Sequence, residues 1–183
     1  MIKNDFRKFV ELTINTFNAS EIKYVLIGGL AATIFGRPRT TLDVDIIIEH
    51  DQGKIQKLQE QLKNNGFIFG ENEIQIALQE RSHCSIFLKD FPYRIDLKGI
   101  YSSLDERSMQ NRIKEIILNE TVFVEKPEDL IIEKLVYGSQ LDLEDVKAII
   151  LRQGDKLDLE YVRYFAVKEQ VEDELNQILE ERG

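Results

Sequence analysis

The sequence predicts an α/β (α+β) fold, with a small mixed sheet of about five strands, packed with helices, and then a C-terminal helical bundle. Before residue 126, apolar and partly β-branched segments typical of strands alternate with amphipathic helical segments. Near Lys126 the composition shifts, and only helical patterns follow. We therefore expect a strand-rich core over residues 1–125 and a helical region over residues 126–183.

Hydrophobic periodicity and turn residues divide the chain into elements. Strands are expected over residues 24–27, 43–48, 67–69, 82–89, 93–99, 113–118 and 121–125. Helices are expected over residues 4–17, 30–35, 51–65, 71–80, 104–111, 127–138, 141–153, 158–168 and 171–181. The pattern over 71–80 is ambiguous, and a short helix is the favoured interpretation.

Particular residues justify several of these boundaries. Gly66, Gly138 and Gly154 each follow a helical pattern, where glycine commonly ends a helix. Pro127 suits the first position of a helix, and acidic residues follow it in the first turn. The helix over 51–65 is expected to be a crossover between two strands, and strands 82–89 and 93–99 are expected to form a hairpin.

Length and composition limit the classes of protein that fit. The 183 residues suffice for one domain, or for a core with a small helical appendix. No apolar run approaches the roughly 20 residues that span a bilayer, and the N-terminus lacks a signal-peptide pattern. The single cysteine, Cys84, leaves no internal disulfide, so a cytoplasmic protein without a membrane partner is expected. A net charge of −9 disfavours broad DNA or RNA binding, although a small basic cleft remains compatible.

A Gly-Gly pair marks the first candidate site. The apolar strand that starts at Tyr24 ends at Gly28 and Gly29, and a short Ala-rich helix follows. Such a pair lets backbone N–H groups approach an anion without obstruction by Cβ, at the positive end of the helix dipole. The alternative is a tight turn that serves close packing alone. We expect Gly28 and Gly29 to bind an anion.

An Asp-x-Asp pair marks the second candidate site. Side chains alternate along a strand, so Asp43 and Asp45 point to the same face of the sheet. Two such carboxylates repel each other unless a cation or water compensates their charge. Asp is unfavourable in strand interiors, which argues against solvated surface acids as the full explanation. Hard oxygen ligands with little imidazole or thiolate nearby suit Mg²⁺, or Mn²⁺.

The ordered set of Gly28-Gly29, Arg39, Thr41 and the Asp-x-Asp pair resembles the core of the nucleotidyltransferase superfamily, which has a polymerase-β-like fold. The longer run GGLAATIFGRPRTTLDVDIII resembles the minimal bacterial nucleotidyltransferases related to AbiEii-type toxins of toxin–antitoxin and phage-defence systems. These resemblances imply a nucleotidyltransferase fold. They also imply Mg²⁺ or Mn²⁺ as cofactor and a nucleoside triphosphate (NTP) as substrate.

The resemblance also implies further site residues. A third acidic residue lies on a neighbouring strand in the superfamily, and Asp96 is the candidate for this third metal ligand. In the AbiEii-like toxins, a Lys and an Asp from the downstream helices complete the catalytic site together with the three acids. Lys134 and Asp145 are the matching positions, with Asp142 as the competing choice. The alternative for these residues is an exposed ion pair of little energetic value.

Arg39 and Thr41 are expected to join the nucleotide site. A guanidinium offers planar, bidentate contact to phosphate oxygens, and Arg39 is favoured over Arg37 because it stands closer to the acidic strand. The alternative for Thr41 is a cap for the strand. Many members of the superfamily have Ser where this chain has Gly29. We therefore expect the Leu30 N–H or a later side chain to take that phosphate contact.

The implied reaction is metal-dependent transfer of a nucleoside monophosphate (NMP) from an NTP to an acceptor hydroxyl. The sequence does not decide whether the acceptor is tRNA, a protein or a small molecule such as an antibiotic. A toxin-type enzyme with a cognate antitoxin as partner ranks first. Two alternatives remain: a non-catalytic nucleotidyltransferase-like module that binds nucleotide or a partner, and a small-molecule (antibiotic) nucleotidyltransferase.

Overall fold

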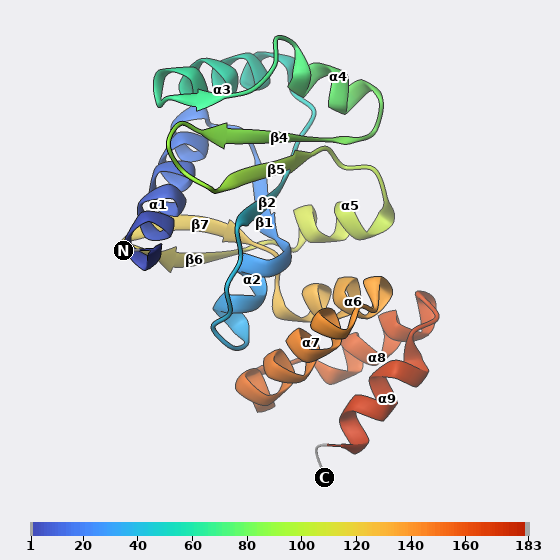
Figure 1. The fold of residues 1–183 in the computed structure, drawn as a ribbon. Helices are drawn as coiled ribbons and strands as arrows, with labels where there is room; N and C mark the ends of the chain where they lie inside the picture. The colour runs from blue at the N-terminus through green and yellow to red at the C-terminus, as the bar shows by residue number, and fades with distance from the viewer. Residues whose placement is uncertain (1, 182–183) are drawn as a thin grey trace.

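The computed structural model describes residues 2–181, and within this range seven strands form one mixed sheet (Figure 1). The strands are β1 (Tyr24–Ile27), β2 (Asp43–Ile48), β3 (Phe67–Ile68), β4 (His83–Leu88), β5 (Arg94–Lys98), β6 (Ile113–Ile117) and β7 (Glu120–Val124). Their order across the sheet is β3-β4-β5-β2-β1-β7-β6. The sheet is wider than the expected five or so strands because β7 pairs with β1 and brings β6 with it.

The helices agree with the sequence analysis in type and order. They are α1 (Ile2–Ser20), α2 (Gly28–Phe35), α3 (Gln52–Asn64), α4 (Glu73–Gln79), α5 (Ser103–Gln110), α6 (Pro127–Tyr137), α7 (Gln140–Gln153), α8 (Leu159–Lys168) and α9 (Glu172–Glu180). The ambiguous segment over 71–80 is helical, as α4. Several boundaries differ from those expected by one to three residues; for example, α1 continues to Ser20 and α2 starts at Gly28. Within residues 2–181, no helix is both long and apolar enough to cross a membrane.

Strand pairing mixes parallel and antiparallel neighbours. β1 runs antiparallel to β2, β2 runs parallel to β5, and β5 forms the expected hairpin with β4. β3 is antiparallel to β4, so it has the direction of β5 and β2. The helix α3 therefore connects two parallel strands, as a crossover does.

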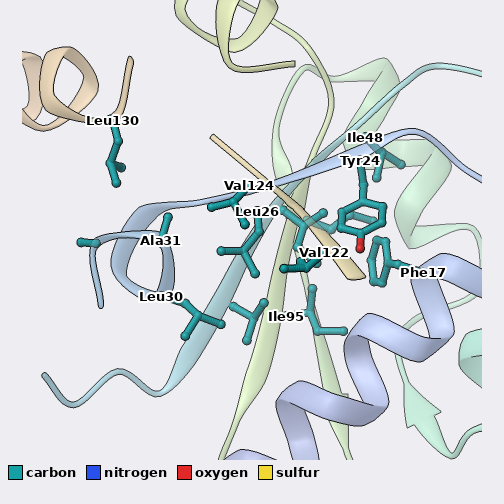
Figure 2. Close-up of a cluster of buried hydrophobic side chains, with 14 of the residues drawn as sticks. Phe17, Tyr24, Leu26, Leu30, Ala31, Ile48, Ile95, Val122, Val124 and Leu130 are labelled. Atoms are coloured by element: carbon teal, nitrogen blue, oxygen red, sulfur yellow. The ribbon is translucent and has the colours of Figure 1, made fainter. Parts of the chain in front are cut away.

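The two faces of the central strands are covered by different helices. Tyr24 and Leu26 of β1 belong to the main apolar core, where Phe17 of α1 packs edge-on against the Tyr24 ring (Figure 2). Ile47 of β2 points to the opposite face and contacts a smaller cluster that includes Met109 of α5. Because α5 is short, it covers only part of this second face.

The four C-terminal helices gather at one end of the sheet, beside α2 (Figure 1). Side chains of α7 bind the last carbonyl groups of α2, which have no partner within their own helix. The Arg152 guanidinium donates to the Gly36 carbonyl at 2.7 Å, and the Gln153 amide donates to the Phe35 carbonyl at 2.7 Å. These contacts hold α7 against the helix that begins at the Gly-Gly pair. The division into domains at residue 125 stays a prediction.

Substitution of Gly36 with Ala tests this helix contact. A Cβ at residue 36 would lie 3.0 Å from the Ala32 carbonyl oxygen and 3.2 Å from the Ile149 backbone nitrogen. Backbone atoms yield little, so we expect Gly36→Ala to destabilise the protein by about 1–3 kcal/mol. At this chain length that corresponds to a fall in Tm of roughly 2–4 °C per kcal/mol, measured by differential scanning calorimetry.

Gly53→Ala is the matched control for this substitution. Gly53 lies in the first turn of α3, and an added Cβ there would meet only the Asp51 side chain, at 3.6 Å. It is expected to raise Tm slightly, because Ala loses less backbone entropy in a helix. An unchanged Tm for Gly36→Ala would contradict a tight contact between α2 and α7.

Candidate functional site

A cavity of about 620 Å³ opens where β1, β2 and β5 meet α2 and α6. Eight of the nine predicted site residues line it: Gly28, Gly29, Arg39, Thr41, Asp43, Asp45, Asp96 and Lys134. The ninth, Asp145, does not line the cavity, and its side chain is only 1% exposed. Segments that are distant in the sequence therefore converge on one cavity.

The register between β2 and β5 brings the three aspartates together. Asp45 pairs with Asp96 across these parallel strands, and Asp43 pairs with Arg94. Period-two alternation directs Asp43, Asp45 and Asp96 to the same face. This is the face that α5 covers at Ile47 and leaves open at Asp43 and Asp45. The expectation that Asp96 lies beside the Asp-x-Asp strand is confirmed.

The carboxylate of Asp45 lies in an unfavourable electrostatic environment. Burial raises its pKa to about 6, and the nearby carboxylates of Asp43 and Asp96 add to the shift. A backbone hydrogen bond from Gly29 and the positive charge of Lys134 oppose it. Gly28, at φ +64°, leaves the space in which the Asp45 carboxylate lies, so a Cβ at residue 28 would collide with that carboxylate. The Gly-Gly pair and the acidic strand are thus packed directly against each other.

The second glycine makes room for polar groups from the next loop. A Cβ at Gly29 would lie 2.7 Å from Nη2 of Arg39 and 3.2 Å from Oγ1 of Thr41. These two side chains therefore occupy the space that a larger residue at position 29 would take. The Thr41 hydroxyl also donates to Oδ1 of Asp43 at 2.6 Å. Arg39 and Thr41 accordingly present a guanidinium and a hydroxyl to the cavity beside the turn.

Lys134 and Arg39 both contact the carboxylate of Asp145. Nζ of Lys134 lies 3.3 Å from Oδ2 of Asp145, and Nε of Arg39 donates to Oδ1 of Asp145 at 3.1 Å. Lys134 also donates to Asp142 at 2.6 Å, so both acidic candidates of α7 contact it. Burial acts to lower the pKa of Lys134, but its bonds to Asp142 and Asp145 outweigh burial and raise it. Lys134 therefore stays a cation, and Asp145 positions two cations rather than facing the cavity.

Sequence reasoning missed Arg94 and its neighbours. Nε of Arg94 donates to Oδ1 and Oδ2 of Asp96 at 3.0 and 2.8 Å, and its Nη2 donates to Oδ2 of Asp43 at 3.1 Å. Ser85 of β4 donates to Oδ1 of Asp96 at 2.6 Å. Lys98 also lines the cavity. Period-two alternation from Asp96 would have found Arg94 and Lys98, because residues two apart on a strand share a face.

A buried acidic pair lies at the base of the cavity. Glu133 lines the cavity, and Glu125, which interacts with it, accepts a hydrogen bond from Ser108 at 2.5 Å through Oε1. Burial raises the pKa of Glu125 well above its ordinary value, and the Glu133 charge adds to the effect. Among the described residues, Oε2 of Glu125 and Oε2 of Glu133 have no hydrogen-bond partner. Burial and the neighbouring carboxylate therefore favour the protonated form of Glu125.

The donor set fits a hard divalent cation in its chemistry. Three aspartates on adjacent strands supply oxygen ligands, and burial, together with the carboxylates of Asp43 and Asp96, raises the pKa of Asp45. Yet among the residues that the structure describes, no three acidic, His or Cys side chains are already arranged around a metal position. The contacts of Arg94 and Thr41 explain this, because they turn Asp43 and Asp96 toward other partners. Binding of a metal ion would require these side chains to reorient.

Glu125→Gln tests the raised pKa of Glu125 through the pH dependence of stability. A carboxyl whose pKa is raised in the folded state binds a proton there that the unfolded chain has released, so stability falls as pH rises through the folded-state pKa. Gln supplies an N–H without titrating. Near pH 5 we expect wild type and Glu125→Gln to have equal Tm values. At pH 8.5 we expect Glu125→Gln to have the higher Tm, because its free energy of unfolding exceeds that of wild type by on the order of 1–3 kcal/mol.

The exposed Glu174→Gln, measured over the same pH series, serves as the control and is expected to shift Tm little at any pH. A constant difference in Tm between wild type and Glu125→Gln from pH 5 to 8.5 would contradict the raised pKa of Glu125. Thermal melts followed by circular dichroism give both comparisons.

Comparison with known proteins agrees with this geometry. Residues 7–182 match the family described as "Nucleotidyltransferase of unknown function (DUF6036)". No curated protein matches the chain. An antigenic nucleotidyltransferase-like protein from Paracoccidioides brasiliensis superimposes with a TM-score of 0.60 at 19% identity, over 98% of this chain and 94% of that one.

Two enzymes of antibiotic modification share the fold at lower identity. ANT(2″)-Ia, in complex with adenylyl-2″-tobramycin, gives a TM-score of 0.61 at 11% identity, over 90% of this chain and 96% of that one. The lincosamide antibiotic adenylyltransferase LnuA, with lincomycin bound, gives 0.54 at 14% identity, over 78% of this chain and 94% of that one. The expected α/β nucleotidyltransferase fold is confirmed. The match over almost the whole chain identifies the protein as a member of the nucleotidyltransferase family of unknown function.

Proposed function

We propose that the protein transfers an NMP from an NTP to an acceptor hydroxyl. The observation that carries this proposal is the juxtaposition of three aspartates with the Gly-Gly turn and two cations, Arg39 and Lys134, around one cavity. Negative groups and phosphate-binding groups beside one another suit a ligand that carries both phosphates and metal ions. The family match supports the same reaction class.

The roles proposed for the nucleotide-binding residues follow from their chemistry. The N–H groups at Gly28 and Gly29, at the positive end of α2, bind phosphate oxygens. The guanidinium of Arg39 and the hydroxyl of Thr41 take the contact that Ser makes elsewhere in the superfamily, since both side chains adjoin Gly29. Lys134 neutralises phosphate charge from the α6 side of the cavity.

Asp43, Asp45 and Asp96 are proposed to hold Mg²⁺, or Mn²⁺. When bound there, the cation would activate the acceptor oxygen and stabilise the charge of the leaving group. The acceptor oxygen forms a bond to the α-phosphorus while the bond from that phosphorus to the α,β-bridging oxygen breaks. Pyrophosphate leaves with the electron pair, and Asp96 is the proposed acceptor of the hydroxyl proton. Catalysis then depends chiefly on orientation and charge stabilisation.

Two observations support two different candidates for the acceptor. The resemblance of the Gly-Gly to Asp-x-Asp run supports a toxin-type enzyme that acts on tRNA or a protein, with a cognate antitoxin. The presence of two antibiotic adenylyltransferases among the structural neighbours supports a small-molecule hydroxyl as the second candidate. In either case we place the reaction in the cytoplasm, where nucleoside triphosphates are available.

A non-catalytic module is the weaker alternative. The absence of Ser after Gly28 gives this alternative its weight. The space beside Gly29 holds the guanidinium of Arg39 and the hydroxyl of Thr41, so donors for a phosphate are present in spite of that absence. A binding module would also have no need for three carboxylates that repel one another at the same face.

A labelling experiment tests the proposed reaction. The protein is incubated with each α-³²P-labelled NTP and Mg²⁺, together with total tRNA, cell extract or a panel of aminoglycosides and lincosamides. We expect label in one acceptor fraction with one preferred NTP. Asp45→Asn is expected to reduce the rate at least about 100-fold, because a metal ligand is lost.

Asp155→Asn is the matched control, since Asp155 is exposed and far along the chain from the cavity-lining strands. It is expected to retain the wild-type rate. Label in the tRNA or protein fraction supports the toxin-type enzyme, and label on a drug supports the small-molecule enzyme. An absence of label in every fraction, with Asp45→Asn indistinguishable from wild type, would refute nucleotidyl transfer.

A further inference from the structure

Arg94 lies where the negative charge of the cavity is concentrated. It extends from β5 on the same face as Asp96 and bonds Asp43 and Asp96 with one guanidinium. Its side chain is 40% exposed, so it lies at the surface and not in the core. The ion pairs therefore bridge the two strands at the position of the acidic residues.

The contacts of Arg94 engage the carboxylate oxygens that a metal would need. Oδ2 of Asp43 accepts from Arg94, and its Oδ1 accepts from Thr41. Both oxygens of Asp96 accept from Arg94, and Oδ1 also accepts from Ser85. All four oxygens of these two aspartates thus have partners within the protein.

A guanidinium and a divalent cation compete for such oxygens. One positive charge on Arg94 balances three neighbouring carboxylates incompletely. A divalent ion would supply twice that charge and would bind Asp45 as well. It would have to remove Arg94 from Asp43 and Asp96 first, and the binding free energy would be reduced by the ion pairs that are broken.

We propose that Arg94 is a resident counter-cation that occupies the metal-binding carboxylates and is displaced when a divalent ion binds. Arg94 thereby lowers the affinity of the site for metal and keeps the metal-free carboxylates from repelling one another. This inference rests on the proposed function, because it takes the three aspartates as the metal ligands. It adds a residue that sets the metal affinity and the stability of the metal-free protein.

Mn²⁺ binding provides the test. Dissociation constants are measured by electron paramagnetic resonance of free Mn²⁺, and Tm is measured with and without Mn²⁺, for wild type and three variants. Arg94→Gln is expected to bind Mn²⁺ roughly tenfold more tightly than wild type, because no ion pairs must be broken. Its Tm without metal is expected to be lower, and Mn²⁺ is expected to raise its Tm more than that of wild type.

Two further variants separate the specific effect from a change in net charge. Arg37→Gln removes an equal charge from a side chain that is 49% exposed and paired with Glu144, so it matches Arg94 in exposure. It is expected to leave Mn²⁺ affinity unchanged. Arg94→Lys keeps the charge and is expected to bind Mn²⁺ much as wild type does.

The possible results decide the inference. Equal or weaker Mn²⁺ binding by Arg94→Gln would overturn it, as would the same tightening in Arg37→Gln. If no protein binds Mn²⁺ at millimolar concentration, both this inference and the metal part of the proposed function fall. If Arg94→Gln binds Mn²⁺ more tightly but no protein transfers nucleotide, the proposed function falls and the inference stands.

Discussion

The parallel pairing of β2 with β5 is the constraint on which the candidate site depends. A shift of one residue in this register would turn Asp96 away from Asp45, because strand side chains alternate between the two faces. The register is held on the opposite face by apolar residues such as Val44 and Ile95, which are fully buried. The same pairing that builds the core thus places carboxylates side by side where α5 no longer covers the sheet.

Burial of like charges has a cost, and the surrounding residues limit it. Asp43 and Asp96 are compensated by Arg94, and Asp45 is compensated only in part by the Gly29 N–H and the charge of Lys134. Such an arrangement destabilises the fold and has no structural benefit of its own. Local conflict with the rules of stable packing is expected mainly at functional positions.

The fold was predictable where the signal is local. Hydrophobic periodicity located the helices and strands, and the Gly-Gly and Asp-x-Asp motifs named four residues that line the cavity, Gly28, Gly29, Asp43 and Asp45. The width of the sheet was not predictable, since the pairing of β1 with β7 joins segments far apart in the sequence and neither strand specifies its neighbour. Asp96 required the resemblance for the same reason.

The roles of individual side chains were less predictable than their presence. Nothing in the sequence distinguishes Asp142 from Asp145, and the structure shows that both contact Lys134. Because Ser is absent after Gly28, the sequence left open whether the Leu30 N–H or a later side chain takes the phosphate contact. The packing of Arg39 and Thr41 against Gly29 favours a later side chain, because a missing side chain at one position creates room for polar groups from another.

Asp145 has a consequence that extends beyond the cavity wall. It belongs to α7 and shares its carboxylate between Arg39, from the loop before β2, and Lys134, from α6. A ligand phosphate that draws one of these cations away leaves the carboxylate to the other, so the affinities of the two cations for a ligand are thermodynamically linked. Binding at one of these two cations thereby alters the other, and α7, through a single side chain.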